Sequence, residues 1–231
     1  MTTALVPPHE AWVVFAAYNE ARVIADVVAD VRHAGQPAVV VDDGSTDGTG
    51  AAAREAGATV LEHPINLGQG AALQTALEYA VSAGAEFIVT FDADGQHRAR
   101  DIPRLMEALL RGGADFALGS RFLGDTLNMP SARRRLLQAA TWFTRATTGL
   151  RITDSHNGLR AMTRRGALAI RLKQNRMAHA SEILHQIAAS GLKYVEAPVT
   201  IEYSTYSLAK GQQLGDSLSI VLDLFARRLH R

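Results

Sequence analysis

Apolar residues in the first half of the chain fall into short runs, and most runs are followed by a segment with helical spacing. The short runs predict strands at Trp12–Ala17, Ala38–Val41, Thr59–Glu62, the segment ending at Asp92, and Asp115–Ser120. The segments between them predict helices at Glu20–His33, Thr49–Ala56, Gly70–Ala83 and Asp101–Arg111. Such alternation is typical of an α/β fold, in which a mostly parallel sheet carries helices on both faces.

The second half of the chain shows weaker periodicity. It predicts a loop from Phe122 to about Arg135 that runs into a helix ending near Thr148, an irregular stretch at Thr153–Arg160, a helix at Ala180–Ala189 and a strand at Tyr194–Ile201. Residues 214–231 predict an amphipathic basic helix, because leucine, valine and phenylalanine recur there at helical spacing before three arginines. We therefore expect a short tail (1–10), one domain (11–213) and a terminal helix (214–231).

Two carboxylates follow the apolar run Ile88–Phe91. Because side chains alternate along an extended segment, Asp92 and Asp94 are expected to point to the same side. Like charges this close raise each other's pKa unless a cation lies beside them. Oxygen ligands at this spacing suit Mg²⁺ or Mn²⁺, whereas the alternative is a solvated turn, since Asp-Gly is a common turn dipeptide.

Composition narrows the classes of function. The 231 residues carry a net charge of +1 and no cysteine, which excludes disulfides and thiolate metal sites and gives no reason to expect a nucleic-acid partner. Residues 1–10 lack the pattern of a signal peptide, and no apolar run approaches the ~20 residues that span a bilayer. A cytoplasmic protein is expected.

Two further turns lie at predicted strand ends. In the segment Asp42–Thr49, we expect Ser45, Asp47 and Thr49 to act as local capping groups. Asp43 differs, because a carboxylate that faces the sheet crevice can accept a hydrogen bond from the ring N–H of a nucleobase. The segment Asn66–Gly70 places glycines at a helix start, where backbone N–H groups favour anionic ligands.

These motifs together resemble the family 2 glycosyltransferases. Four segments occur in that family's order and spacing, followed by Gly119-Ser120-Arg121: residues 17–20, 42–49, 66–70 and 92–97. The chain is most similar to the branch of dolichyl-phosphate mannose synthase and bacterial polyprenyl-phosphate glycosyltransferases, over about residues 11–210. The resemblance implies a GT-A fold with a Rossmann-like sheet, a nucleotide-sugar donor, a divalent metal and inversion at the anomeric carbon.

The resemblance also implies roles for individual residues. It places Ala17, Tyr18, Glu20 and Asp43 around the base and ribose, Asp92 between nucleoside and metal, Asp94 and Gln96 on Mg²⁺ or Mn²⁺ against the diphosphate, Arg121 near the phosphates or the acceptor, and Lys210 over the diphosphate. A growing negative charge on the leaving diphosphate needs such cations, and arginine adds bidentate phosphate contacts.

The acceptor side leaves alternatives open. Arg133, Arg134 and Arg135 either grip a lipid phosphate, as the resemblance implies and as we favour, or form a solvated helix face. A phosphate acceptor is already anionic and needs no strong base, whereas a sugar hydroxyl requires one, for which Asp154 is the candidate. For His156 we expect a structural hydrogen bond, and Glu182 fits either a buried helix edge or the active site.

We therefore expect a metal-dependent inverting transferase that moves a sugar from a UDP- or GDP-linked donor to a polyprenyl phosphate. The alternatives are transfer to a hydroxyl of a growing cell-surface glycan, or a nucleotide-sugar binding protein without catalysis. For the tail helix, contact with the inner face of the plasma membrane, packing on the domain and a homodimer seam all remain open. A small membrane protein is a further candidate partner, if the acceptor is lipid-linked.

Overall fold

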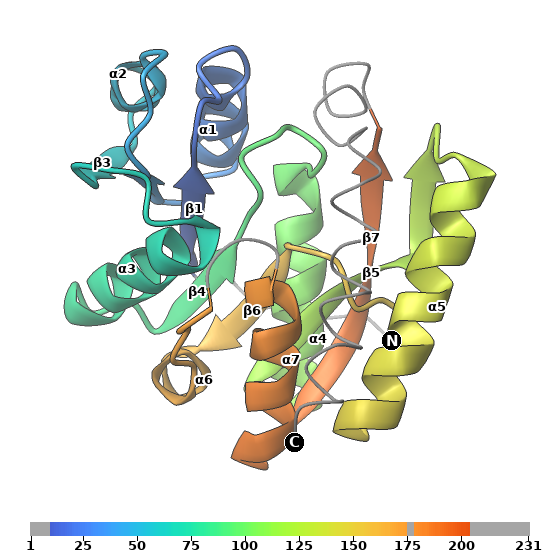
Figure 1. Cartoon of the computed structure of the whole chain (residues 1–231). Coiled ribbons are helices and arrows are strands. Elements are labelled where there is room, and N and C mark those ends of the chain that lie inside the picture. Colours follow the sequence, from blue (N-terminus) through green and yellow to red (C-terminus); the bar gives the residue numbers. More distant parts are fainter. Residues whose placement is uncertain (1–9, 175–177, 204–231) are drawn as a thin grey trace, which may run out of the picture.

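A single seven-stranded sheet forms the centre of the molecule (Figure 1). The computed structural model describes residues 10–174 and 178–203. In chain order the strands are β1 (Trp12–Ala17), β2 (Ala38–Asp42), β3 (Thr59–Glu62), β4 (Phe87–Thr90), β5 (Phe116–Leu127), β6 (Arg160–Thr163) and β7 (Tyr194–Glu202). Their order in the sheet is β3-β2-β1-β4-β6-β5-β7, and β6 alone runs antiparallel to its neighbours. The expected α/β architecture with a mostly parallel sheet is confirmed.

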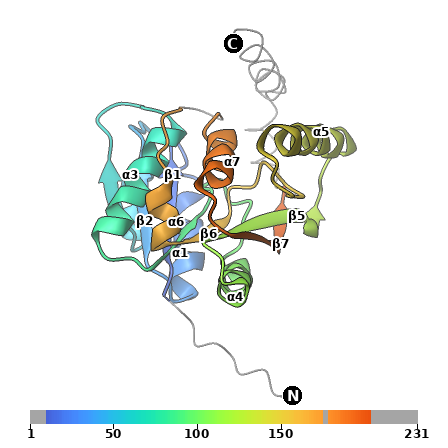
Figure 2. The same cartoon turned by 90° about the horizontal axis from the view of Figure 1, so that it is seen from below.

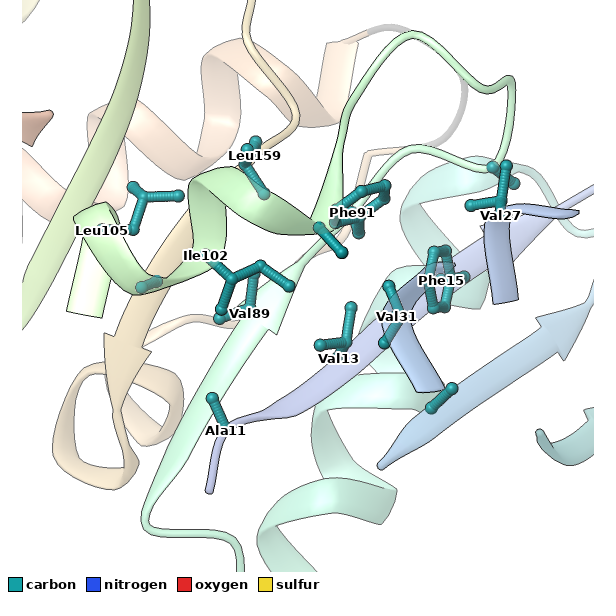
Figure 3. Packing of buried hydrophobic residues seen from close by; sticks show 14 of the residues in the cluster. Ala11, Val13, Phe15, Val27, Val31, Val89, Phe91, Ile102, Leu105 and Leu159 are labelled. Carbon is teal, nitrogen blue, oxygen red and sulfur yellow. The ribbon is translucent and has the colours of Figure 1, made fainter. Parts of the chain in front are cut away.

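Helices cover both faces of this sheet (Figure 2). They are α1 (Ile24–His33), α2 (Thr49–Glu55), α3 (Gln69–Ser82), α4 (Ile102–Gly112), α5 (Ser131–Thr148), α6 (Arg164–Ala169) and α7 (Ala178–Ser190). Alternate residues of β1 point to opposite sides, so Val13 and Phe15 pack with α1 and α4 (Figure 3), whereas Val14 packs with α3. The hydrophobic core therefore consists of one apolar layer on each side of the sheet. Among the described helices, none has the length and apolar character needed to cross a membrane.

The sheet topology brings three chain segments to one edge. Strands β2, β1 and β4 are neighbours and parallel, so the residues after Ala17, Asp42 and Thr90 all emerge at their carboxyl ends. Because β6 is antiparallel, the segment that precedes it reaches the same edge, where Arg160 pairs with Thr90. Ligands of open α/β sheets bind beyond such an edge, so the fold places the candidate residues where a site is expected.

The predicted loop beginning at Phe122 is wrong in its first half. Strand β5 continues to Leu127 and, after an irregularity, pairs again with β7 from Asp125 onward. Gly124 marks a close approach here, because a Cβ at this position would lie 2.2 Å from the carbonyl oxygen of Val199. The glycine thus permits strand pairing and does not mark a loop, as a glycine in a polar stretch would suggest. Strand β6 and helix α6 were also not predicted.

Candidate active site

The loops after β1 and β2 are joined by side-chain hydrogen bonds. Ser45 Oγ accepts from the backbone N–H of Asn19 at 2.9 Å, and Thr49 Oγ1 accepts from that of Glu20 at 2.8 Å. Asp47 accepts from the N–H of Ala21 at 3.0 Å and also from Thr49. The expected local contact at the helix start is seen only for Asp47, which accepts from the N–H of Thr49, whereas Ser45 and Thr49 hold the neighbouring loop. They fix residues 18–21, which leaves the ring of Tyr18 exposed above the sheet edge.

Asp43 is almost completely buried, at 2% exposure. Its carboxylate accepts from the backbone N–H groups of Leu67 at 3.0 Å and Gly68 at 2.7 Å, and lies 2.7 Å from Nδ1 of His63. Its own backbone N–H donates to the carbonyl of Ala17 at 2.8 Å. Asp43 therefore holds the loop before α3 against β2, and a contact between its carboxylate and a nucleobase stays a prediction.

Asp92 is held from two sides. On one side, Nε2 of His97 lies 3.1 Å from Oδ2 of Asp92. The buried ring of His97 packs edge-on against Phe91, and its Nδ1 has no hydrogen-bond partner among the described residues. On the other side lies Gly158, whose carbonyl accepts from Thr90 Oγ1 at 2.6 Å. The residues after β4 and the segment before β6 thus together fix the position of this carboxylate.

The two carboxylates of this turn have opposite pKa shifts. Burial and the neighbouring charge of Asp92 raise the pKa of Asp94 to about 6, with a further contribution from Glu20. Burial also acts to raise the pKa of Asp92, but the hydrogen bond from His97 and the positive charge of Arg160 bring it below its ordinary value. The pKa of Asp94 is raised even though its carboxylate accepts the N–H of Gln96 at 3.0 Å.

These ligands fit a divalent cation bound together with substrate. In the part of the chain that the structure describes, no three His, Asp or Glu side chains come close enough to hold a metal ion by themselves. Mg²⁺, however, usually takes only one or two protein carboxylates and completes its shell with water and substrate phosphate. The carboxylate of Asp94 and the side-chain oxygen of Gln96 are donors of this kind, and a cation beside Asp94 would favour its ionised form.

Arg121 and Asp154 form a buried ion pair. Nε of Arg121 donates to Oδ2 of Asp154 at 2.6 Å, and the backbone N–H of Arg121 donates to the same oxygen at 3.1 Å. Arg121 also donates to the hydroxyl of Tyr203 at 2.7 Å and to the carbonyl of His156. Its guanidinium is therefore engaged inside the protein, and the expected contact of Arg121 with phosphate stays a prediction.

Arg160 is a functional candidate that sequence reasoning missed. It lies on β6 between β4 and β5, is 3% exposed, and its charge acts on both Asp92 and Asp154. Burial lowers the pKa of Arg160 below the ordinary value for arginine. Burial lowers the pKa of His156 to about 4, and the positive charges of Arg121 and Arg160 act in the same direction. This imidazole is therefore neutral near pH 7. The sequence places Arg160 at the end of the irregular stretch Thr153–Arg160 but indicates no role for it.

Comparison with known proteins decides the family. The model of the glycosyl transferase family 2 matches residues 12–173. The chain belongs to this family. An uncharacterized protein of Methanocaldococcus jannaschii is 34% identical over 95% of this chain and 93% of its own length. The polyprenol monophosphomannose synthase of Mycolicibacterium smegmatis is 30% identical over 88% of this chain and 82% of its own.

Two further comparisons extend this result. The UDP-N-acetylglucosamine–dolichyl-phosphate N-acetylglucosaminyltransferase of Methanococcus voltae is 30% identical over 87% of this chain and 88% of its own length. Glucosyl-3-phosphoglycerate synthase of Mycobacterium tuberculosis, solved with Mn²⁺, UDP-glucose and phosphoglyceric acid, superimposes with a TM-score of 0.71. The match covers 94% of this chain and 79% of that chain at 20% identity, and it shows the fold alone. The expected GT-A glycosyltransferase fold is confirmed.

The arginines that are expected to bind the acceptor lie at the start of α5. The guanidinium of Arg133 stacks 5.0 Å from the ring centre of Tyr203, and that of Arg134 lies 5.9 Å from the ring centre of Phe122. Arg133 thereby joins a chain of contacts through Tyr203 to Arg121 and Asp154. Arg135 is exposed.

Glu182 and Lys210 complete the candidate residues. Glu182 accepts from the backbone N–H groups of Lys173 and Gln174, so it fixes the segment before α7. That segment lies close to α3, because a Cβ on Gly70 would lie 2.0 Å from the carbonyl oxygen of Gln174. The role of Glu182 seen here is therefore structural. Lys210 and the predicted helix 214–231 lie outside the described residues.

Proposed function

We propose that this glycosyltransferase moves one sugar from a nucleotide-sugar donor, UDP- or GDP-linked, to a polyprenyl phosphate, with inversion and with Mg²⁺ or Mn²⁺. Two relatives support this acceptor, since their names state a dolichyl-phosphate and a polyprenol product. The donor is expected at the carboxyl ends of β1, β2 and β4, around Ala17, Tyr18, Glu20 and Asp43. The catalytic centre is expected at Asp92, Asp94 and Gln96.

The burial and ion pairing of Asp154 are the observation that favours a phosphate over a hydroxyl as the acceptor. A sugar hydroxyl must lose its proton to a base, whereas a phosphate monoester is already ionised near neutral pH. Asp154 is buried and ion-paired with Arg121, and Nδ1 of His156 lies 2.8 Å from Ser155 Oγ. Neither group is a free base that faces solvent. The arrangement therefore favours an acceptor that brings its own negative charge.

The proposed reaction follows from these positions. An oxygen of the acceptor phosphate forms the new bond to the anomeric carbon, while the bond to the diphosphate breaks and its electron pair leaves with the diphosphate. Asp94 and Gln96 would hold a divalent metal ion, which when bound would supply positive charge beside that diphosphate. His97 and Gly158 hold Asp92 in one position, and Arg133 and Arg134 bind the acceptor phosphate. Because the site holds donor and acceptor in line, less entropy is lost in reaching the transition state, and the activation free energy is lower.

A ligand panel tests the donor site. Thermal unfolding is measured with UDP, GDP, CDP and dTDP, each with Mn²⁺ or with EDTA, for the wild type and Asp94→Ala. A ligand that binds only the folded state raises the melting temperature by mass action. We expect one nucleotide to stabilise the wild type in the presence of Mn²⁺ and to lose this effect in Asp94→Ala. Equal stabilisation in EDTA would contradict the dependence on a metal, and no stabilisation by any of the four nucleotides would contradict the proposed donor site.

The acceptor is tested by the identity of the product. The sugar nucleotides of the base identified above are supplied with a polyprenyl phosphate or with an oligosaccharide that offers only hydroxyls, and products are analysed by mass spectrometry. We expect a glycosyl phosphate with the first acceptor only. Transfer to the oligosaccharide would overturn the phosphate acceptor in favour of glycan extension. A cytoplasmic enzyme that contacts the membrane at its inner face accords with this substrate.

A further inference from the structure

Helix α5 carries a tryptophan on its exposed side and two threonines at its buried positions. Its buried positions include Thr141 and Thr144, whose hydroxyls donate to the carbonyls of Leu137 at 2.9 Å and Ala140 at 3.0 Å. Its exposed face carries Trp142, which is 70% exposed and is the most exposed of the large apolar side chains in the described residues. A helix that packs on a soluble core normally buries its aromatic residues, because each removes much apolar area from water. The outer face of α5 therefore presents a surface that favours a partner.

That outer face is also cationic. It includes the exposed residues Arg134, Arg135, Gln138, Ala139, Trp142 and Ala146. Arg134 and Arg135 precede Trp142 by eight and seven residues, so helical spacing places all three on one face. The whole of α5 contains four arginines and neither aspartate nor glutamate. We call these six residues the α5 face, and Figure 1 shows α5 along one edge of the molecule.

We propose that the α5 face lies on the surface of an anionic lipid bilayer. Arginine side chains are attracted to anionic headgroups, and an indole ring favours the boundary between headgroups and acyl chains. A second copy of the chain fits less well, because a symmetric contact would set Arg134 and Arg135 of one copy close to the same arginines of the other. The predicted tail helix, residues 214–231, is also net positive, with three arginines and two aspartates. Charge complementarity thus selects the bilayer.

The same helix connects this face to the reaction. Arg133, one residue before the α5 face begins, stacks on Tyr203, whose hydroxyl bonds Arg121 beside Asp154. A bilayer against α5 would bring a lipid phosphate to the N-terminal end of the helix, where Arg133 and Arg134 lie. This step rests on the proposed polyprenyl phosphate acceptor, whereas the contact between α5 and the bilayer does not.

Tryptophan fluorescence tests the contact directly. The chain has two tryptophans, Trp12 and Trp142, so Trp12→Phe leaves Trp142 as the single reporter. This variant is mixed with vesicles of phosphatidylcholine alone or with one-third phosphatidylglycerol. We expect a blue shift of the emission and quenching by brominated acyl chains with the anionic vesicles only. Unchanged emission with the anionic vesicles would overturn the proposal.

Sedimentation with vesicles supplies matched variants. In the otherwise wild-type chain, we expect Trp142→Gln to weaken binding to anionic vesicles at least about tenfold, from the apolar area lost. Arg135→Gln should weaken it about fivefold, from one lost charge near the headgroups. Leu168→Gln, which changes an exposed apolar residue on α6, should bind as the wild type does. Equal binding by Trp142→Gln and Leu168→Gln would overturn the proposal.

Activity separates this proposal from the proposed function. With a short, water-soluble polyprenyl phosphate, Trp142→Gln should match the wild type, and with the long acceptor in anionic vesicles it should lose at least about tenfold. Full activity of Trp142→Gln in vesicles would overturn the α5 contact while the function stands. Vesicle binding through Trp142 without transfer to either acceptor would overturn the function and leave the contact supported.

Discussion

Gly158 leaves the space that the carboxylate of Asp92 occupies. A Cβ at position 158 would lie 2.1 Å from Oδ1 and 2.2 Å from Oδ2 of Asp92, far inside van der Waals contact. The backbone of Gly158 is not in the left-handed region, so the absence of a side chain, and not the backbone angle, is what this position requires. Asp92 therefore depends on a glycine from a distant part of the chain.

We expect Gly158→Ala to fold but to lose activity. The added methyl group must displace the carboxylate of Asp92, and a displacement of about 1 Å at a reacting centre can cost 10²-fold in rate. The measurement is kcat/KM for the donor together with the melting temperature. Gly112→Ala is the control, because its Cβ would lie 2.8 Å from Val195 Cγ1 in another part of the fold. Full activity of Gly158→Ala would show that activity does not depend on the position of the Asp92 carboxylate.

Asp94→Asn should stabilise the metal-free protein at alkaline pH. The pKa of Asp94 is raised from 3.8 to about 6, so its contribution to stability is fully present below pH 3.8 and is lost as pH rises through 6. Above pH 7 the neutral amide should therefore be more stable than the wild type by up to about 3 kcal/mol, and near pH 4 the two should agree. Urea unfolding in EDTA across this pH range measures the difference.

Addition of Mn²⁺ should reverse this order. A cation that binds Asp94 in the folded state stabilises the wild type by mass action, whereas Asp94→Asn should respond much less. Asp26→Asn, which changes an exposed carboxylate on α1, is the control for loss of one negative charge. A constant difference between wild type and Asp94→Asn from pH 4 to 8 would contradict the raised pKa.

Asp154→Asn should destabilise the protein strongly. The change removes the charge that compensates Arg121 in the interior, and breaking one side of a buried ion pair costs about 3–5 kcal/mol. Arg54→Gln breaks the exposed pair with Glu62 and should cost less than about 1 kcal/mol. Both are measured by urea unfolding at pH 7. If Asp154→Asn instead keeps full stability and loses only turnover, Asp154 acts as a base, and the hydroxyl acceptor gains support.

The sequence alone predicts which turns lie at the carboxyl edge of the sheet, but it does not predict which side chains contact one another there. Strand order places the residues after β1, β2 and β4 together, so turns that each carried a weak signal could be expected to meet. Hydrophobic period and turn residues are local properties, and they located these strands closely. Gly158 and Arg160 act through Asp92, which precedes them by a long stretch of chain, and no local pattern encodes such a partner.

The missed half of β5 has the same origin. A glycine in a polar stretch normally indicates a turn or loop, and Gly124 was interpreted in this way. Its structural reason is the backbone of Val199 on β7, which only the folded sheet brings close. Likewise, the motif of Arg121 predicts a place near the phosphates or the acceptor, which stays a prediction, but it does not encode the contacts of its guanidinium with Asp154 and Tyr203.

His156 should make the protein sensitive to acid. Its pKa is lowered to about 4 by burial and by the nearby charges of Arg121 and Arg160, against 6.5 for an ordinary histidine. A lowered pKa means that its contribution to stability is present above pH 6.5 and is lost as pH falls toward 4, because only the unfolded chain readily takes up the proton. The loss amounts to at most about 3 kcal/mol.

The variant His156→Gln removes this titration. We expect it to be less stable than the wild type at pH 7.5, since a packed imidazole bonded to Ser155 is lost, and to approach or exceed the wild type near pH 4.5. Urea unfolding at half-unit steps of pH gives both curves, with the exposed His185→Gln as the matched histidine control. Parallel curves for His156→Gln and the wild type would mean that the imidazole titrates alike in the folded and unfolded chain. That result would contradict the lowered pKa of His156.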